Sequence, residues 1–333
     1  MNPALPPRLK AAADALLEGV SRKELAAKAG AISEHYRGGR GSSAAIARDG
    51  DALAYLVARL PATYAVAAAC LAQLREAAPD FEPSSLLDVG AGPGTASWAA
   101  LETWPALAAI TLTDSNPRFL ELARWLAEDH ATLARTAFVA HDLGHAIDLP
   151  RAELVVASFV LAEIAPAAQA RTVEKLLAAA EDVLLLIEPG TPDGFARIRA
   201  ARAQLIEQGA HILAPCTHGN ACPIRSVGES RSDKNDSPDW CHFSQRLPRS
   251  RDHMQAKGAR VPFEDERYSW IAVSRARNSA NEGHTRVLAP PKDSKPGITL
   301  KLCTADGLEE RFVARRDKDA FARVRKAAWG DVI

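Results

Sequence analysis

The sequence predicts an α/β protein with a Rossmann-like fold, a mostly parallel β-sheet covered by helices. From residue 85 onward, short runs rich in β-forming residues alternate with helical runs, and such alternation produces βαβ units and a parallel sheet. The first of these runs, 85–89, breaks directly into a loop with three glycines, 90–94. A strand that ends in such a loop lets the backbone approach a bound nucleoside closely. A helical region precedes this part, and a cysteine-bearing module follows it.

Helical patterns fill most of the first eighty residues. Ser21 and Glu24 have the spacing of a capping box, in which each side chain accepts a hydrogen bond from the backbone at a helix start. Pro61 suits the first turn of a second helix, because an N–H there would have no partner within the helix. Between the two, residues 32–41 are polar and interrupted by glycines, so we expect a loop there.

The elements of the central part follow in order along the chain. The expected strands are 85–89, 109–113, 136–140, 153–159 and 182–187. The expected helices are 95–103, 117–129, 167–180 and 192–208. After residue 208 the alternation stops, and the polar segment 225–239 is expected to be a mobile loop. Additions to the same sheet and a small appended module are expected from later strands at 267–277, 297–303 and 310–314.

The glycine-rich loop has a specific spacing. Gly90, Gly92 and Gly94 follow a Gly-x-Gly-x-Gly pattern, which differs from the Gly-x-Gly-x-x-Gly of dinucleotide-binding proteins. Each glycine lacks the Cβ atom that would keep a cofactor away from the backbone. Thr95 starts the following helix, whose N-terminal amides therefore face the loop. Asp88, in front of the first glycine, is expected to order the loop or to contact the cofactor.

Two further carboxylates follow the next two strands. Asp114 ends the second expected strand, where a carboxylate can accept hydrogen bonds from both ribose hydroxyls. Asp142 follows the third strand, a position that often binds the adenine amino group. With the glycine loop, these residues resemble the class I methyltransferases that use S-adenosylmethionine (SAM). The resemblance implies a class I SAM-dependent methyltransferase fold, with cofactor contacts at Asp88, Gly90, Gly92, Gly94, Asp114 and Asp142.

The end of the fourth expected strand carries no recognisable catalytic motif. Residues 157–163 contain neither an Asn/Asp-Pro-Pro-Tyr motif for base amino groups nor a Pro-Cys nucleophile. Glu163 could contact a substrate or support its loop, and Glu188, after the fifth strand, has the same two interpretations. The catalytic residues therefore stay unassigned, and a SAM-dependent RNA methyltransferase is one of the functions left open.

Composition restricts the classes of function. The 333 residues are 47% hydrophobic and 25% charged, which is ordinary for a globular protein. No apolar run reaches the roughly 18 residues that a membrane span needs, so we expect no membrane partner. The N-terminal residues lack the apolar region of a secretory signal, and we expect a cytoplasmic protein in a reducing compartment.

Charge is unevenly distributed along the chain. Residues 1–240 carry a net charge of −7 and residues 241–333 a net charge of +7. A basic segment on a neutral protein indicates either a face for an anion such as RNA or a solvated surface. The expected phosphate contacts are Arg246, Arg249, Arg251, Lys257 and Arg260.

Five cysteines are present, an odd number that argues against a disulfide framework. Cys70 lies in an alanine-rich stretch and is expected to be a buried apolar residue. The other four are Cys216, Cys222, Cys241 and Cys303. Four thiolates gathered from loops and one strand fit either an all-cysteine zinc site or an iron–sulfur cluster. His218 and His242 are alternative ligands.

Several segments together resemble one family, the methyltransferase-like assembly proteins of the small ribosomal subunit in bacteria and mitochondria. The segments are the glycine loop, 211–216, Cys222-Pro223, 240–246, 263–266, 286–291, 302–307 and 329–331. The resemblance covers nearly the whole chain. It implies a [4Fe–4S] cluster on the four cysteines 216, 222, 241 and 303, and association with the small ribosomal subunit or its rRNA.

Three functions stay open on the sequence. The chain is expected to methylate small-subunit rRNA, or to be a non-catalytic assembly factor that keeps SAM and the cluster for structure and RNA docking. A weaker alternative is a small-molecule methyltransferase with a structural zinc. We expect a helical region over 1–80, a SAM-binding domain over 81–210, and a metal-cluster module with the C-terminal strands over 211–333. The oligomeric state is not indicated.

Overall fold

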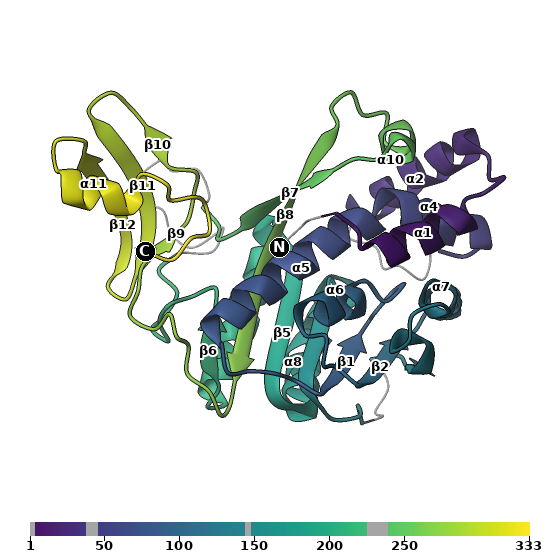
Figure 1. The fold of residues 1–333 in the computed structure, drawn as a ribbon. Helices are drawn as coiled ribbons and strands as arrows, with labels where there is room; N and C mark the ends of the chain where they lie inside the picture. The colour runs from purple at the N-terminus through teal and green to yellow at the C-terminus, as the bar shows by residue number, and fades with distance from the viewer. Residues whose placement is uncertain (1–3, 38–45, 144–147, 225–238) are drawn as a thin grey trace.

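The large sheet organises the molecule. The computed structural model describes residues 4–37, 46–143, 148–224 and 239–333, and within them the large sheet has eight strands (Figure 1). They are β1 (Ser85–Val89), β2 (Ala109–Asp114), β3 (Ala137–Ala140), β4 (Ala152–Ser158), β5 (Ala180–Pro189), β6 (His211–Ala214), β7 (Phe243–Pro248) and β8 (Phe263–Ser274). Their order is β3-β2-β1-β4-β5-β8-β6, with β7 paired to β8.

Strand direction divides this sheet into two parts. The first five strands in that order are parallel to one another, whereas β8 runs antiparallel to β5 and to β6. This arrangement is that of the class I SAM-dependent methyltransferases, so the predicted fold class is confirmed. The sheet takes β6, β7 and β8 from the segment after residue 210, as well as five strands from the segment before it.

Helices cover both faces of the sheet, and the strands are apolar on both sides for that reason. One core joins Leu86 and Leu185 of the sheet to the N-terminal helices, and the other joins Leu87 and Leu184 to the helices of the opposite face. The first group is α1 (Pro7–Leu16), α2 (Arg22–Arg37), α4 (Asp49–Ala58), α5 (Leu60–Ala77), α6 (Thr95–Thr103) and α7 (Pro117–Ala127). The second group is α8 (Pro166–Ala179) and α9 (Pro192–Glu207). Two short 3-10 helices are η1 (Leu133–Arg135) and η2 (Leu161–Glu163).

The N-terminal helices differ from the sequence prediction at one point. The Ser21 hydroxyl accepts a hydrogen bond from the Glu24 N–H at 3.4 Å, as the capping pattern predicts, and Pro61 lies in the first turn of α5. The expected loop beginning at residue 32 is wrong, because α2 continues to Arg37 and buries Ile32 in the core. Residues 38–41 of that prediction lie outside the described residues.

Helices α4 and α5 carry the most apolar helical sequence in this region. Within the described ranges, no single helix has the length and hydropathy of a membrane span, and α4 and α5 reach both only as a pair bent by 52°. Much of this apolar surface is buried in the core, including Tyr64, Leu71 and Leu74 of α5. The bend falls at Arg59, between the two helices.

Strands β7 and β8 extend beyond the sheet as a long antiparallel pair (Figure 1). Helix α10 (Arg251–Ala256) lies between them in sequence and packs against α2 and α4. We call this projection, residues 243–268, the basic arm. The predicted loop at 225–239 lies outside the described residues except for Asp239.

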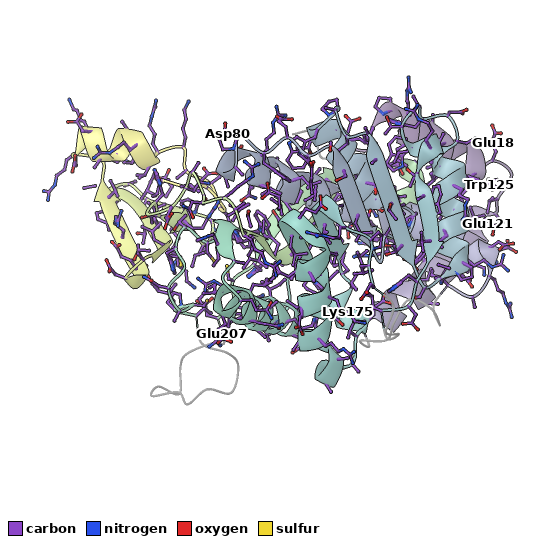
Figure 2. All side chains as sticks on the ribbon, turned by 90° about the horizontal axis from the view of Figure 1, so that it is seen from below. Glu18, Asp80, Glu121, Trp125, Lys175 and Glu207 are labelled. Atoms are coloured by element: carbon purple, nitrogen blue, oxygen red, sulfur yellow. The ribbon has the colours of Figure 1, made fainter. Side chains whose placement is uncertain are left out.

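A second, smaller sheet follows the basic arm. It contains β9 (Arg286–Val287), β10 (Lys292–Asp293), β11 (Gly297–Thr304) and β12 (Gly307–Ala314), and α11 (Lys318–Val324) packs on it. The expected strands at 297–303 and 310–314 form a hairpin, since β11 and β12 pair antiparallel up to Thr304 and Gly307. This module lies at one end of the molecule, and Glu18, Glu121 and Trp125 lie at the opposite end (Figure 2).

Candidate functional site

A cavity of about 340 Å³ opens at the carboxyl ends of the parallel strands. This is the position where open α/β sheets bind their ligands. Five of the six residues predicted to contact a cofactor line it: Asp88, Gly90, Gly92, Asp114 and Asp142. The sixth, Gly94, does not line the cavity.

The side chain of Asp88 lies in the interior of this site and is only 1% exposed. Its Oδ2 accepts hydrogen bonds from the N–H and the hydroxyl of Ser97, at 3.0 and 2.8 Å. These bonds fix the start of α6 relative to β1. The other oxygen, Oδ1, is buried and has no hydrogen-bond partner among the described residues. Burial raises the pKa of Asp88 to about 7.

Asp114, at the end of β2, ties the glycine loop to the next turn. Its Oδ2 accepts a hydrogen bond from the Gly92 N–H at 2.8 Å, and its Oδ1 accepts one from the Asn116 N–H at 2.7 Å. Burial raises the pKa of this carboxyl to about 6. Each carboxylate oxygen keeps one further lone pair, which is the capacity that ribose hydroxyls need. Asp142 lies at the exposed edge of the same cavity.

Two glycines of the glycine-rich loop are required by close packing. At Gly90, where φ is +63°, a Cβ atom would lie 2.4 Å from Cγ2 of Val160. The loop after β1 therefore packs directly against the loop after β4. At Gly94, where φ is +80°, a Cβ atom would lie 2.9 Å from the side chain of Leu112. The structure thus gives Gly94 a role in placing α6 against β2, away from the cavity.

The segment after β4 lines the cavity but offers little acid–base chemistry. Phe159 has a φ of +63°, a region that a bulky residue rarely adopts, and its N–H donates to the Ile187 carbonyl at 2.6 Å. The carboxylate of Glu163 is exposed at the cavity wall. Phe159 itself lines the cavity at this strained position.

The sequence patterns do not predict the cavity-lining residues that come from α4 and α5. Tyr55, Arg59 and Thr63 reach the cavity from the bend between α4 and α5. Arg59 Nη2 donates to Glu266 of β8 at 3.1 Å, and this neighbouring charge raises the pKa of the guanidinium. Burial raises the pKa of Tyr55 to about 12. No local motif identifies these residues, since only the packing of α4 and α5 brings them to the site.

A second, apolar cavity holds all four of the cysteines that the sequence singled out. Cys216, Cys222, Cys241 and Cys303 line it, with about 40 Å³ of free space as the side chains stand. Burial raises the pKa of the Cys303 thiol to about 12 and that of Cys241 well above its usual range, and the neighbouring cysteines add to both effects. Cys70 is fully buried elsewhere in the core, as predicted.

The thiols surround a space rather than converge on a point. Over the described parts of the chain, no three His, Cys, Asp or Glu side chains are close enough to hold one metal ion. His218 Nε2 lies 3.5 Å from Cys303 Sγ. His242 instead stacks on Trp240 with ring centroids 4.9 Å apart and does not line the cavity.

The basic arm keeps only part of its predicted phosphate-binding surface. Arg249 and Lys257 both bind Glu264, at 3.3 and 2.6 Å, and their side chains are 13% and 17% exposed. The expectation that these two contact phosphate is therefore wrong. Burial raises the pKa of Glu264, but hydrogen bonds from His253 and Lys257 outweigh this effect and hold the pKa below its usual range. Exposed arginines are present at 246, 251 and 260, and the first of them pairs with Asp265.

Comparisons with known proteins identify relatives of this chain. The family model described as "Mitochondrial small ribosomal subunit Rsm22" matches residues 49–333. The human ribosome assembly protein METTL17, mitochondrial, is 24% identical over 311 residues, which cover 86% of this chain and 63% of the relative. Rsm22-cox11 tandem protein 2, mitochondrial, from Schizosaccharomyces pombe is 23% identical over 331 residues, which cover 85% of this chain and 43% of the relative.

A solved structure also resembles the chain. Magnesium protoporphyrin IX methyltransferase from Synechocystis, with bound SAM, has a TM-score of 0.41 and 14% identity, covering 69% of this chain and 85% of its own. The chain spans less than two thirds of the length of the curated relatives that it matches.

These matches correct one expectation and establish the family. The family model and both relatives are described as mitochondrial, so the expected cytoplasmic location is wrong. The family model covers most of the chain, including the glycine loop and all four lining cysteines. The chain belongs to the mitochondrial small ribosomal subunit Rsm22 family.

Proposed function

We propose that this protein binds SAM in the large cavity, carries a [4Fe–4S] cluster on Cys216, Cys222, Cys241 and Cys303, and acts in assembly of the small ribosomal subunit through rRNA. The observation that carries the proposal is the convergence of five predicted cofactor residues on one cavity. The same chain gathers four cysteines around a second cavity.

The chemistry of the large cavity suits SAM. The buried Oδ1 of Asp88 is an acceptor without a partner among the described residues, and the ammonium group of a methionine moiety supplies a donor. Asp114 offers lone pairs for ribose hydroxyls beyond those used by Gly92 and Asn116. Asp142, at the exposed edge of the cavity, is the proposed contact of the adenine amino group. SAM supplies an electrophilic methyl group when it is bound.

The arrangement of the thiols favours a cluster over a single zinc ion. Zinc–thiolate bonds of about 2.3 Å in a tetrahedron bring the sulfurs to about 3.8 Å of one another. In a [4Fe–4S] cluster each cysteine binds its own iron, so the four thiolates stay farther apart. A donor set that lines one cavity without converging on a point fits the second case. Zinc stays the alternative.

The ribosomal role rests on the family and on the surface of the chain. The family description names the small ribosomal subunit, and the human relative is named a ribosome assembly protein. Exposed arginines on the basic arm add a surface that suits phosphate. A docking role without methyl transfer is a second candidate, because the segment after β4 provides only the exposed Glu163 as an acid or base.

One experiment separates these functions. The full chain, purified without oxygen, is incubated with small-subunit precursor rRNA and SAM labelled in its methyl group, beside the Asp114→Asn variant. Label that appears in the RNA with the wild-type protein but not with Asp114→Asn identifies an rRNA methyltransferase. Saturable RNA binding without label identifies an assembly factor that transfers no methyl group. The absence of RNA binding overturns the ribosomal proposal.

A further inference from the structure

Two buried arginines face the cysteine cavity. Arg202 on α9 is 5% exposed and Arg286 on β9 is 4% exposed, and both line the cavity beside the four thiols. Burying a guanidinium is unfavourable unless a negative group compensates its charge. Neither arginine forms an ion pair with a carboxylate in the part of the chain that the structure describes. Their compensation must come from another source.

The contacts of both arginines are with neutral oxygens. Arg202 Nη2 donates to the carbonyls of His218 and Asn220, at 2.9 and 2.7 Å. Both carbonyls belong to the loop between Cys216 and Cys222, so Arg202 also holds that loop in place.

Arg286 has the same kind of partners. Its Nε donates to the Pro215 carbonyl at 2.7 Å, and its Nη1 donates to Gln73 Oε1 and to the Gly330 carbonyl at 3.2 and 2.5 Å. Burial lowers the pKa of Arg286, and the charged forms of Cys216 and Cys241 are the largest effects that raise it. Thiolates deprotonated by a bound metal would therefore supply negative charge beside this guanidinium.

Arg202 has a donor left over. Its Nε is buried and has no hydrogen-bond partner among the described residues, which is rare for a charged donor in a protein interior. The side chain lines the cavity that the thiols surround. A negatively charged sulfur atom held in that cavity would be an acceptor of opposite charge.

We propose that Arg202 and Arg286 are the counter-charges of the metal centre, and that Arg202 Nε donates a hydrogen bond to a sulfur of the bound cluster. The proposal rests on the cluster assigned under the proposed function. Four thiolates around an oxidised [4Fe–4S] core leave two negative charges, which the guanidinium groups of Arg202 and Arg286 offset. A third arginine, Arg199, also lines the cavity. Reduction adds a third negative charge, so positive neighbours favour the reduced form and raise the reduction potential. They also slow the loss of metal.

The test compares the holoprotein with two variants and a control. Arg202→Gln removes the charge and Nε, Arg202→Lys keeps a charge but removes Nε, and Arg171→Gln removes an exposed arginine of α8 that does not line the cavity. Each protein is titrated by potential while its visible absorption is recorded. The rate at which a chelator extracts the metal is measured separately, and circular dichroism confirms folding.

We expect a lower midpoint potential and about 10–100-fold weaker metal retention in Arg202→Gln, the range typical of lost outer-sphere partners. Arg202→Lys should fall between this variant and the wild type, and Arg171→Gln should match the wild type. A folded Arg202→Gln that equals the wild type in both measurements overturns the proposal. If Arg202→Gln does not fold, an unchanged Arg202→Lys overturns it.

The failure of the cluster assignment is distinguishable from this outcome. Wild-type protein that contains zinc and no iron contradicts the cluster, but the extraction rates still decide the role of Arg202. In that case, faster loss of zinc from Arg202→Gln supports the counter-charge, and equal loss overturns it. Wild-type protein that holds no metal and takes none up overturns both proposals.

Discussion

Glu188, at the end of β5, and Arg197, on α9, form a buried ion pair with 2.6 Å between Oε2 and Nε. The other oxygen of Glu188 accepts a hydrogen bond from the Leu161 N–H at 3.0 Å. One carboxylate therefore joins α9 to the segment after β4, which lines the large cavity. Burial raises the pKa of Glu188 despite the charge of Arg197, so this pair is costly to form and depends on its geometry.

Glu188→Gln should lower the free energy of unfolding by about 2–3 kcal/mol, since it leaves Arg197 without its charged partner in a mostly buried site. Urea unfolding followed by circular dichroism measures the change. Glu181→Gln is the matched control, because Glu181 is exposed and lies 3.7 Å from Arg151. Its effect should stay within about 0.5 kcal/mol. Equal effects of the two variants would show that the buried pair does not stabilise the fold.

The affinity for SAM should rise between pH 5.5 and 7.5. Burial raises the pKa of Asp88 to about 7 and that of Asp114 to about 6, and a cationic ligand favours the ionised carboxylates. The unliganded protein should show the opposite trend. The native state holds protons that the unfolded state releases above its ordinary pKa near 3.8, so the free energy of unfolding falls as pH rises toward 7.

Asp88→Asn isolates this effect. The variant should flatten both pH dependences in the upper part of the range, whereas Asp129→Asn, at an exposed position on the protein surface, should leave them unchanged. Calorimetric titrations and urea unfolding at several pH values measure the two trends. A SAM affinity that is independent of pH in the wild type would contradict the assignment of these carboxylates.

Each of the four cavity cysteines should be needed for the metal. Replacing Cys216, Cys222, Cys241 or Cys303 by serine should lower iron and sulfide content and also the melting temperature, because ligand assembly is coupled to folding. Cys70→Ala should keep the metal and lose only about 1 kcal/mol of stability through lost packing. Full metal content in the Cys303 variant would exclude the four-ligand assignment.

The exposed arginines of the basic arm should contribute to RNA binding through charge alone. Replacing Arg251 and Arg260 together by glutamine should reduce the slope of log affinity against log salt by roughly 1.5, because each phosphate contact contributes about 0.7–0.9. Filter binding with small-subunit rRNA at several salt concentrations measures the slope. Lys257→Gln should instead destabilise the arm, since Lys257 binds Glu264. An unchanged slope in the double variant would remove this surface from the interface.

The parts of the molecule that depend on local sequence were predictable. The spacing of the glycines, with Asp88, Asp114 and Asp142 at strand ends, placed five residues on one cavity. The carboxyl ends of parallel strands meet at one edge of the sheet, however the helices pack. This part of the site therefore follows from the order of the elements. Gly94 does not line the cavity, and spacing alone does not distinguish a glycine that faces a ligand from one that packs against Leu112.

The remaining parts depend on packing between distant segments. Tyr55 and Arg59 reach the cavity only because α4 and α5 meet at a bend beside it. From composition, Arg249 and Lys257 are positive charges available to a ligand, but Glu264 of β8 forms ion pairs with both of them. The role of Arg202 was equally hidden, since its partners lie 16 and 18 residues away in a loop with no regular structure.

The proposed cofactor site is measured by calorimetric titration of the wild-type protein with SAM at pH 7.5. We expect one binding site per chain. We also expect that Asp114→Asn weakens binding by about 1–3 kcal/mol, roughly 5- to 150-fold, through loss of a charged acceptor. Asp129→Asn should bind as the wild type does. No measurable binding by folded wild-type protein, or an affinity that Asp114→Asn leaves unchanged, would contradict a SAM site at the ends of β1 and β2.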